Sequence, residues 1–443
     1  MGVNIMAERV RTSPQYESFH ELYKNYTTKE LTSKAKELKI SSYSKLNKKE
    51  LVLAIMEAQM EKDGNYYMEG ILDDIQPDGY GFLRTVNYSK GEKDIYISAS
   101  QIRRFEIKKG DKVTGKVRKP KENEKYYGLL QVDFVNDQNA EEVKKRPHFQ
   151  ALTPLYPQER IQLETTEKNY STRIMDLITP IGLGQRGMIV APPKAGKTSL
   201  LKEIANAIAI NQPNAKLFVL LIGERPEEVT DIERSVEQAE VVNSTFDEPP
   251  EHHVKVAELL LERAKRLVEI GEDVIILMDS LTRLARAYNL VIPPSGRTLS
   301  GGLDPASLHR PKHFFGAARN IEAGGSLTIL ATALVETGSR MDDMIYEEFK
   351  GTGNMELHLD RKLSEKRVFP AIDIRRSSTR KEELLLDPKE LEMVWQLRNL
   401  FTDQNDFAER FIRKLKRTKT NEEFFEVLRK SMLESAKTGK SII

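Results

Sequence analysis

The stretch that most constrains this chain is residues 188–204, MIVAPPKAGKTSLLKEI, where a short apolar run meets a helical repeat. It follows the phosphate-binding pattern G-x-x-x-x-G-K-[ST] except at the first position, which is Ala191. The other positions of the pattern are present as Gly196, Lys197 and Thr198. Alanine can replace glycine at that position if φ stays negative. The flanking residues predict the strand and the helix that such a loop joins.

The donors to a bound phosphate must come from the end of this loop, because Pro192 and Pro193 carry no backbone N–H. The candidate donors are Lys194, Ala195, Gly196, Lys197, Thr198 and Ser199. Further along, the apolar run DVIILMDS ends in Asp279, where a second strand would place a carboxylate near a Mg²⁺ held by Thr198. We therefore expect ATP and Mg²⁺ here, against the alternative of a chance Gly-Lys-Thr beside an ordinary buried strand.

Composition limits the possible classes of protein. The chain has 443 residues, which is room for roughly two to four domains. Its formal net charge is +2 with 31% charged residues, so any contact with nucleic acid must be local. It has no cysteine, which excludes disulfides and thiol catalysis. Because no apolar run reaches about 18 residues and no signal segment is present, we expect no membrane partner and a soluble, cytoplasmic protein.

The pattern of apolar residues changes along the chain and predicts a multidomain α+β and α/β protein. Residues 1–64 have helical spacing and suggest an N-terminal helical domain. Residues 65–138 have short strands of period two, which indicate a small OB-type (cold-shock-like) barrel. Residues 139–150 form a charged linker. In residues 151–443, apolar strands alternate with amphipathic helices, as in a mostly parallel RecA-like sheet.

Aromatic residues of the predicted barrel suggest a surface that binds bases. In DGYGFLR, the rings of Tyr80 and Phe82 alternate with Gly79 and Gly81, so both fall on one face of a strand, which Arg84 continues. Nearby segments add Asp94, Tyr96, Glu124 and Tyr126. Rings for stacking, an arginine for phosphate and acids for exocyclic amines suit a single-stranded nucleic acid. The alternative is that these rings belong to the core.

Other polar residues lie where a motor would need them. Glu224 and Arg225 follow the apolar run LLIG at the strand end where ligands bind, and Glu224 could orient or deprotonate water. Two Gly/Ser-rich loops carry Arg297 and Arg340 and could line a pore. The segment EKRVFPAIDIRRSSTRKEE gathers several arginines around Phe369.

Taken together, these motifs resemble the bacterial Rho transcription termination factor family over about residues 30–430. The resemblance rests on GLGQRGMIVAPPKAGKTSLL, LLIGERPEEVTDIERSV, VIILMDSLTRLARAYN, FFGAARNIEAGGSLTILATAL, YEEFKGTGNMELHLDRKLSEKRVFPAID and DGYGFLR. It implies a homohexameric, ring-shaped, RNA-dependent ATPase and RNA helicase or translocase. Its implied partners are single-stranded, preferably pyrimidine-rich RNA and the RNA polymerase elongation complex, from which it releases nascent RNA.

The resemblance also implies roles for individual residues. The implied catalytic residues are Glu224 at the water, Lys197 at the phosphates and Arg380 as an arginine finger. Implied ATP contacts outside the loop are Gly182, Leu183, Gly184, Gln185, Arg186, Gly187, Arg225, Arg367 and Phe369, the last packing on the base. Implied primary RNA contacts are Gly79, Tyr80, Gly81, Phe82, Leu83, Arg84, Asp94, Ile95, Tyr96, Glu124, Lys125 and Tyr126. Implied secondary RNA contacts are Arg297, Arg340 and Lys350, and the implied metal residues are Thr198 and Asp279.

Two other functions fit parts of the sequence. An ATP synthase-like catalytic subunit would share the nucleotide motifs but has no need of a stacking face at Tyr80 and Phe82. An RNA-binding protein with a degenerate ATPase would not need Lys197, Glu224 and Asp279 intact. One departure from the family pattern also stands out, since Gly223 precedes Glu224 where an acid is expected.

Overall fold

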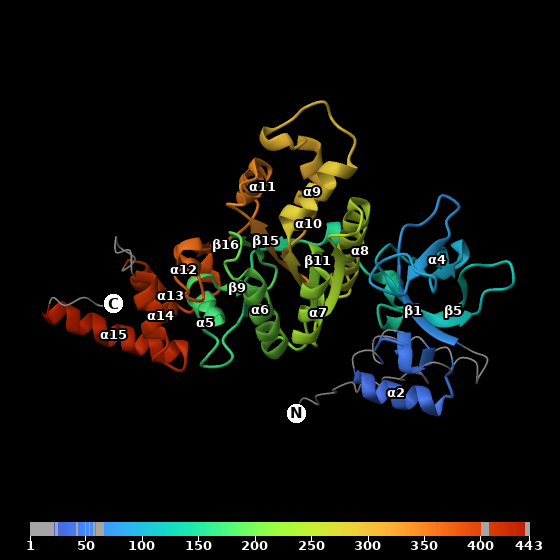
Figure 1. The fold of residues 1–443 in the computed structure, drawn as a ribbon, viewed down its shortest axis with the longest axis horizontal. Helices are drawn as coiled ribbons and strands as arrows, with labels where there is room; N and C mark the ends of the chain where they lie inside the picture. The colour runs from blue at the N-terminus through green and yellow to red at the C-terminus, as the bar shows by residue number, and fades with distance from the viewer. Residues whose placement is uncertain are drawn as a thin grey trace, which may run out of the picture. The chain divides into compact units, whose positions relative to one another are not determined.

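The computed structural model describes residues 22, 25–40, 43–48, 50–52, 54, 55, 58, 66–399 and 407–438. The chain divides into two compact units, residues 1–145 and 146–443 (Figure 1). Much of the predicted helical domain, including residues 1–21, lies outside the described residues. The finer division of the chain at residues 64, 138 and 150 stays a prediction.

Helix α2 (Thr28–Glu37) shows why the early helical spacing forms a helix. Thr27 caps it: its hydroxyl accepts from the N–H of Glu30, and Oε2 of Glu30 accepts from the N–H of Thr27 at 2.7 Å. Leu31 and Ala35, four residues apart, are both fully buried. They share one hydrophobic cluster with residues of the strands that follow.

The described strands of the first unit form a barrel, which confirms the prediction. Their order is β3-β2-β1-β4-β5-β6, and a parallel pairing of β3 with β5 closes the sheet. The strands are β1 (Tyr66–Leu72), β2 (Gly81–Arg84), β3 (Ile95–Ile97), β4 (Lys112–Arg118), β5 (Tyr127–Val135) and β6 (Gln138–Asn139). Within the predicted strand region, the segment DIYISASQI is strand only in its first half. Its second half opens helix α4 (Ala99–Phe105), because Ser98 and Gln101 form a capping box.

The second unit is built on a mostly parallel sheet, as the alternation of strands and helices predicted. In its described part the main order is β12-β11-β13-β15-β10-β16-β17, and only β17 runs antiparallel along this path. The strands are β10 (Arg186–Ala191), β11 (Lys216–Glu224), β12 (Glu240–Thr245), β13 (Asp273–Asp279), β15 (Ser326–Leu334), β16 (Met355–Leu359) and β17 (Ile372–Thr379). The short strands are β7 (Pro154–Leu155), β8 (Arg160–Ile161), β9 (Ile181–Gly182) and β14 (Arg319–Ile321).

The helices of this unit lie between its strands in the sequence or, for α13–α15, follow the last strand (Figure 1). They are α5 (Tyr170–Ile178), α6 (Lys197–Asn211), α7 (Pro226–Ser235), α8 (Pro250–Val268), α9 (Leu281–Val291), α10 (His309–Gly316), α11 (Arg340–Lys350), α12 (Arg361–Glu365), α13 (Pro388–Asn399), α14 (Phe407–Leu415) and α15 (Asn421–Thr438). Short 3₁₀ turns lie at Tyr43–Lys45, Val143–Lys145, Phe149–Ala151, Ser300–Gly302, Pro305–Leu308 and Glu382–Leu384.

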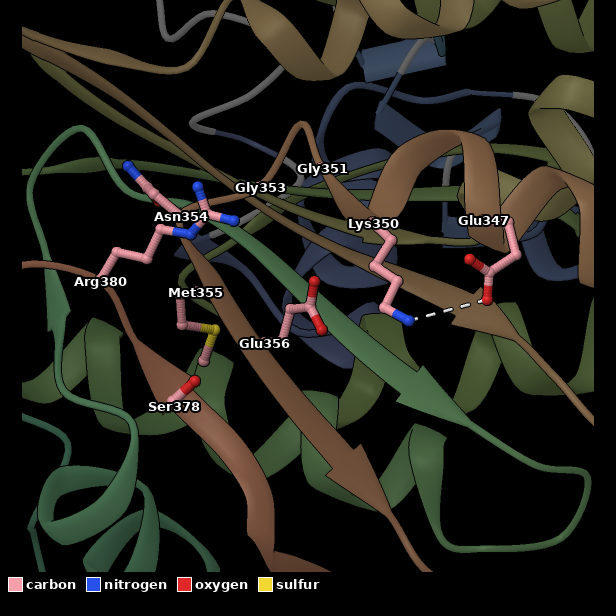
Figure 2. Close-up of a pocket in the computed structure, with 9 residues that line it drawn as sticks. All are labelled: Glu347, Lys350, Gly351, Gly353, Asn354, Met355, Glu356, Ser378 and Arg380. Carbon is pink, nitrogen blue, oxygen red and sulfur yellow. Dashed lines mark ion pairs between the residues drawn. The ribbon is translucent and has the colours of Figure 1, made fainter.

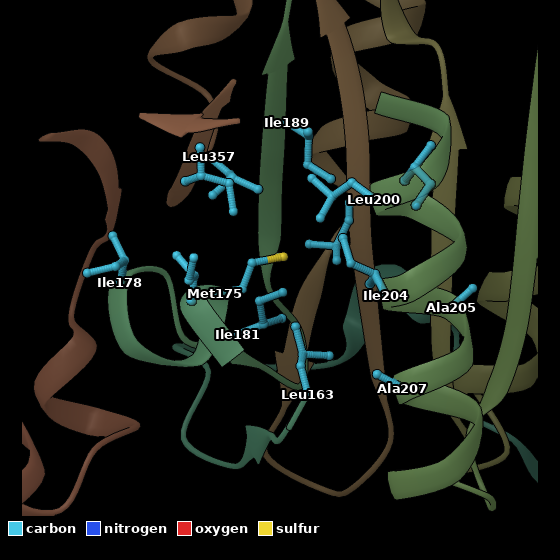
Figure 3. Packing of buried hydrophobic residues seen from close by; sticks show 14 of the residues in the cluster. Leu163, Met175, Ile178, Ile181, Ile189, Leu200, Ile204, Ala205, Ala207 and Leu357 are labelled. Atoms are coloured by element: carbon cyan, nitrogen blue, oxygen red, sulfur yellow. The ribbon is translucent and has the colours of Figure 1, made fainter. Parts of the chain in front are cut away.

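The core beside the phosphate loop holds that loop in place. Ile189 of β10 belongs to the same buried cluster as Leu200 and Ile204 of α6, and Met175 of α5 and Leu357 of β16 complete this region (Figure 3). Burial of each such side chain contributes about 1.5–3 kcal/mol relative to exposure. The strand before the loop and the helix after it are thus fixed to the same core.

A fully buried arginine joins α5 to the C-terminal helices. Arg173 donates from Nη1 to the carbonyl of Thr418 at 2.7 Å and from Nη2 to the carbonyl of Thr420 at 2.8 Å. Its Nε donates to Oδ1 of Asn421 at 3.2 Å, and the Asn421 amide donates back to the carbonyl of Arg173. Burial lowers the pKa of Arg173, and these acceptors compensate for the loss of water around its charge.

Within the described part of the chain, no helix combines the length and the apolar character needed to cross a lipid bilayer.

Candidate functional site

The phosphate loop has the backbone of an anion-binding turn. Ala191 is the last residue of β10, so its side chain fits an extended backbone, as the sequence required. Lys194 and Gly196 both have positive φ, 65° and 91°, and α6 begins at Lys197. The Ser364 hydroxyl donates to the carbonyl of Lys194 at 2.9 Å and braces the loop. The N–H groups at the start of α6 can therefore bind phosphate.

Lys197 lies between two carboxylates that come from the ends of two strands. Its Nζ is 3.1 Å from Oε1 of Glu224, at the end of β11, and 2.5 Å from Oδ1 of Asp279, at the end of β13. Burial opposes the charged form of Lys197, but the charges of Asp279 and Glu224 raise its pKa. The sequence predicted these three residues for one site, and the structure brings them together.

The pKa of Glu224 is raised, first by burial and then by the nearby charge of Asp279. Lys197 and Arg283 act in the opposite sense. The Nε of Arg283 lies 3.4 Å from Oε1 of Glu224. A carboxylate whose pKa is raised at the mouth of a phosphate loop is suited to accept a proton from water.

Asp279 offers an oxygen that a metal could use. Its Oδ1 accepts from the hydroxyl of Thr332 at 2.8 Å and from Lys197, whereas Oδ2 is buried without a hydrogen-bond partner among the described residues. Thr198 follows Lys197 in the first turn of α6. Mg²⁺ in such sites takes one or two protein oxygens and completes its shell with water and phosphate, so this donor set fits Mg²⁺.

Phe369 lies beside the loop, although it is far from it in sequence. A Cβ built on Gly196 would be 3.7 Å from Cε1 of Phe369, and 41% of the Phe369 side chain is exposed. Arg367, two residues earlier, is exposed and has φ of 60°. The exposed Arg225 follows Glu224 and caps α7. An exposed ring next to the loop can stack on a base.

Gly182–Gly187 lies at the wrong end of β10 to border a nucleotide held by the loop of its own chain. Arg186 begins this strand and Ala191 ends it, and at about 3.3 Å per residue the strand separates them by roughly 15–20 Å. Gln185 instead donates to Oδ1 of Asn354 at 2.7 Å, and Gly184 donates to the hydroxyl of Thr328. Within one chain these residues thus lie away from the phosphate loop, and their expected contact with ATP stays a prediction.

Arg380 lies at this same far end of β10, in a pocket of about 450 Å³ (Figure 2). The backbone N–H of Arg380 donates to the carbonyl of Asn354. The backbone N–H of Asn354 donates in turn to the carbonyl of Arg186, the first residue of β10. Burial lowers the pKa of Arg186, and the charges of Arg319 and Arg380 add to this effect. The pocket is lined by Glu347, Lys350, Gly351, Gly353, Asn354, Met355, Glu356, Ser378 and Arg380.

Lys350 and Arg380, expected in two separate roles, thus share one pocket (Figure 2). Lys350 ends α11 and lies 3.7 Å from Glu347, while Arg340 begins the same helix. Arg340 and Arg297 are exposed, and the Arg297 loop is held by Ser295, which donates to Asp304. Helix α11 therefore links a predicted RNA loop at one end to the Arg380 pocket at the other.

The barrel carries a cluster of four aromatic rings, Tyr80, Phe82, Tyr96 and Tyr126. Ring centroids of Tyr80 and Phe82 are 5.8 Å apart, and those of Phe82 and Tyr126 are 4.7 Å apart. The Tyr96 ring is 39% exposed and the other three are half-buried, so none belongs to the barrel core. The prediction that Tyr80 and Phe82 share a face is confirmed. A Cβ at Gly81 would lie 2.7 Å from Cδ1 of Leu72, so the Leu72 side chain would have to shift to accept one.

The polar residues predicted beside these rings are less available than expected. Arg84 is only 6% exposed; its guanidinium donates to Asp73 at 2.6 Å and also to Asp94, which is itself buried. Glu124 accepts from Arg118 at 2.9 Å, and this hydrogen bond lowers the pKa of Glu124 to about 2. Lys125 is exposed, whereas Leu83 and Ile95 are buried in the core. The roles of all these residues as RNA contacts stay predictions. The four aromatic rings form the accessible part of this surface.

Sequence reasoning missed two residues of the nucleotide site, Thr332 and Arg283. Thr332 was hidden in the apolar run LTILATALV of β15. Arg283 lies four residues after Asp279, in the first turn of a helix that follows a strand end. That spacing alone was a usable signal, because residues in the first turn of such a helix face the strand ends.

The second unit is similar to nucleotide-binding domains of known ATPases. Residues 171–379 match the ATP synthase alpha/beta family, nucleotide-binding domain. A prototypical ATPase from the type III secretion system of pathogenic bacteria superposes with a TM-score of 0.53 at 23% identity, covering 67% of this chain and 90% of that one. The type III secretion ATPase EscN from enteropathogenic E. coli gives 0.52 at 22% identity, covering 70% and 78%. These structures show a shared fold, and the family match makes the second unit a nucleotide-binding domain of the ATP synthase alpha/beta type.

The remaining matches identify the family. Residues 21–64 match the Rho termination factor, N-terminal domain, and residues 68–141 match the Rho termination factor, RNA-binding domain. Transcription termination factor Rho of Bacillus subtilis is 69% identical over 404 residues, which are 91% of this chain and 94% of that protein. The Aquifex aeolicus protein of the same name is 53% identical over 96% of this chain and 100% of its own length. The Escherichia coli K12 protein is 52% identical over 92% of this chain and 99% of its own length. The chain belongs to the Rho transcription termination factor family.

Proposed function

We propose that this chain is an RNA-stimulated ATPase that assembles into a homohexameric ring, moves along single-stranded RNA and releases nascent RNA from the RNA polymerase elongation complex. The family membership supports the termination activity. The observation that supports assembly into a ring is that Arg380 and Lys197 lie at opposite ends of β10. A cation that serves hydrolysis from that edge can reach only the nucleotide of another subunit.

Each residue of the nucleotide site then has a role. Lys197 leaves Glu224 and Asp279 to engage the phosphates, and the N–H groups at the start of α6 bind the same oxygens. Glu224 orients a water and accepts its proton. Thr198 and Asp279 hold Mg²⁺, which, when bound, neutralises charge on the phosphates. Phe369 packs on the base, with Arg225 and Arg367 nearby.

The residues at the Arg186 end of β10 supply the second half of a nucleotide site that is shared between two subunits. Arg380 would neutralise charge that develops on the γ-phosphate of the neighbouring subunit. Arg186 and the rest of Gly182–Gly187 lie at this edge, so we propose that they border the neighbour's nucleotide rather than their own. Because Lys350 shares the Arg380 pocket and α11 begins at Arg340, RNA bound at Arg297, Arg340 and Lys350 can influence hydrolysis.

RNA engages first at the barrel, where the rings of Tyr80, Phe82, Tyr96 and Tyr126 stack on bases. The preference for pyrimidine-rich RNA in this proposal comes from the family resemblance. Because the proposed substrate is nascent RNA, we also propose that the protein acts in the cytoplasm.

Hydrolysis with different polymers tests this function. We expect ATP hydrolysis to be strongly stimulated by poly(C) RNA and much less by poly(C) DNA or by no polymer. Equal rates in all three conditions would contradict RNA-dependent catalysis and favour an ATP synthase-like enzyme. RNA binding without hydrolysis would favour an RNA-binding protein with a degenerate ATPase, although the contacts of Lys197 with Glu224 and Asp279 speak against that.

A further inference from the structure

Residues 360–371 form a closed segment between β16 and β17, which we call the strap. Its two ends meet, because the backbone N–H of Asp360 donates to the carbonyl of Ala371 at 2.7 Å. The Asp360 carboxylate also accepts from the N–H of Leu363 at 2.9 Å and caps α12, the short helix inside the strap. These bonds fix the start of α12 and therefore the direction of the side chains that follow.

The strap contacts the phosphate loop at two points. Oγ of Ser364 donates to the carbonyl of Lys194 at 2.9 Å. The ring of Phe369, five residues later, lies beside Gly196, where a built Cβ would be 3.7 Å from Cε1 of the ring. One segment of the chain therefore contacts the phosphate loop on both sides of Ala195.

The residue that Ser364 contacts has a backbone conformation that is unfavourable for a lysine. Lys194 has φ of 65°, in the left-handed region that a side chain with a Cβ disfavours. Gly196 has φ of 91°, but glycine adopts such a conformation without strain. The loop therefore needs a contact from outside to keep Lys194 in this conformation, and the hydrogen bond from Ser364 supplies one.

We propose that Ser364 is a positioning residue, which holds the phosphate loop in its binding conformation before a nucleotide arrives. This inference rests on the proposed binding of ATP at this loop. Ser364 acts through the carbonyl of Lys194 and touches no phosphate. Apparent affinity scales with the fraction of the chain that is already in the binding conformation, so loss of this hydrogen bond weakens binding even if the contacts in the complex are unchanged.

The test is ATP binding and steady-state ATP hydrolysis by the full chain with Mg²⁺ and poly(C) RNA. Ser364→Ala should raise Kd and KM for ATP roughly 2–10-fold, the effect of one neutral hydrogen bond, and leave kcat unchanged. Ser364→Thr keeps a hydroxyl and should stay close to the wild type. Ser235→Ala is the matched control, because Ser235 is also half-buried and donates to a backbone carbonyl, that of Asp231 at 2.6 Å on α7.

Two further ligands separate the phosphate loop from the base site. Inorganic triphosphate engages only the loop, so Ser364→Ala should weaken its binding by the same factor as that of ATP. Adenosine engages the base site at Phe369, and its binding should not change.

Unchanged Kd values for ATP and triphosphate in Ser364→Ala would overturn the inference, as would equal losses in Ser364→Ala and Ser364→Thr. Weaker binding of adenosine alone would also overturn it, because the strap would then act on the base. So would a lower kcat at constant KM. A wild-type chain that binds neither ATP nor triphosphate would instead contradict the proposed function itself.

Discussion

Nζ of Lys197 lies 3.1 Å from Oε1 of Glu224, so the residue proposed to bind phosphate and the residue proposed to activate water hold each other. We expect arrival of the triphosphate to draw the ammonium toward the phosphates and to weaken this contact, because the phosphates carry more negative charge than one carboxylate. The same movement frees the carboxylate to accept a proton. Phosphate binding and preparation of the base are thus one event in this geometry.

Glu224→Gln should bind ATP but hydrolyse it about 10²–10⁴-fold more slowly, because an amide keeps the shape of the side chain but cannot accept the proton. Nucleotide binding by fluorescence and hydrolysis in the presence of RNA measure the two effects. Lys197→Ala is the contrasting variant and should fail at binding. If Glu224→Gln hydrolysed ATP at the wild-type rate, another group would be the base.

Arg380→Ala should bind ATP and RNA normally and lose hydrolysis by a factor on the order of 10³–10⁵, as happens where arginine fingers are removed. Its place at the far end of β10 predicts that it serves a neighbouring subunit. Mixed rings of Arg380→Ala and Lys197→Ala chains should therefore regain single-turnover hydrolysis, at interfaces with one intact loop and one intact arginine. Verified mixed hexamers without recovery, or full activity in an isolated monomer, would show that Arg380 does not act between subunits.

Replacing both Tyr80 and Phe82 by alanine should weaken binding of pyrimidine RNA by about 2–6 kcal/mol, if each ring stacks on one base. ATP affinity without RNA should not change. Leu130→Ala is a matched control, because Leu130 is an apolar residue of the same barrel with 58% exposure and lies outside the ring cluster. Normal RNA affinity in the double variant would place the primary site elsewhere.

Asp176 should make the stability of the second unit depend on pH. Burial raises its pKa from 3.8 to about 7, although Arg160 and the N–H groups of Leu163 and Glu164 oppose this. The folded chain therefore binds this proton more tightly than the unfolded chain does. The contribution of Asp176 to the free energy of unfolding is fully present below pH 3.8 and is lost as the pH rises through about 7.

Asp176→Asn cannot ionise, so its free energy of unfolding relative to the wild type should rise as the pH increases through that interval. Urea unfolding followed by circular dichroism at several pH values measures this difference. Asp231→Asn is the control: Asp231 is exposed, and its hydrogen bond with Lys202 lowers its pKa, so its difference should stay flat over the same interval. A flat difference for Asp176→Asn would show that Asp176 stays ionised in the folded chain.

Much of the nucleotide site could be predicted because strand ends meet at one edge of a parallel sheet. Lys197, Glu224 and Asp279 each follow an apolar run, and that local signal was sufficient to bring them together. The same signal could not show that Gly182–Gly187 lies at the other end of β10, because this segment precedes the strand instead of following it. The burial of Arg84 could not be predicted for another reason. Alternation along β2 gave its face correctly, but the partners that bury it, Asp73 and Asp94, lie on other segments.

The contacts of Arg173 limit how far the second unit can be shortened from its C-terminal end. The nucleotide-binding family match ends at residue 379, whereas the acceptors at Thr418, Thr420 and Asn421 lie beyond it. A fragment cut at the end of that match would lose these acceptors, leaving Arg173 with Glu164 at 3.4 Å, and it would also lose the core residues Phe411 and Phe424. We therefore expect the smallest stable ATPase domain of this chain to extend into α15. Its C-terminal helices are part of the domain core and cannot be removed without loss of stability.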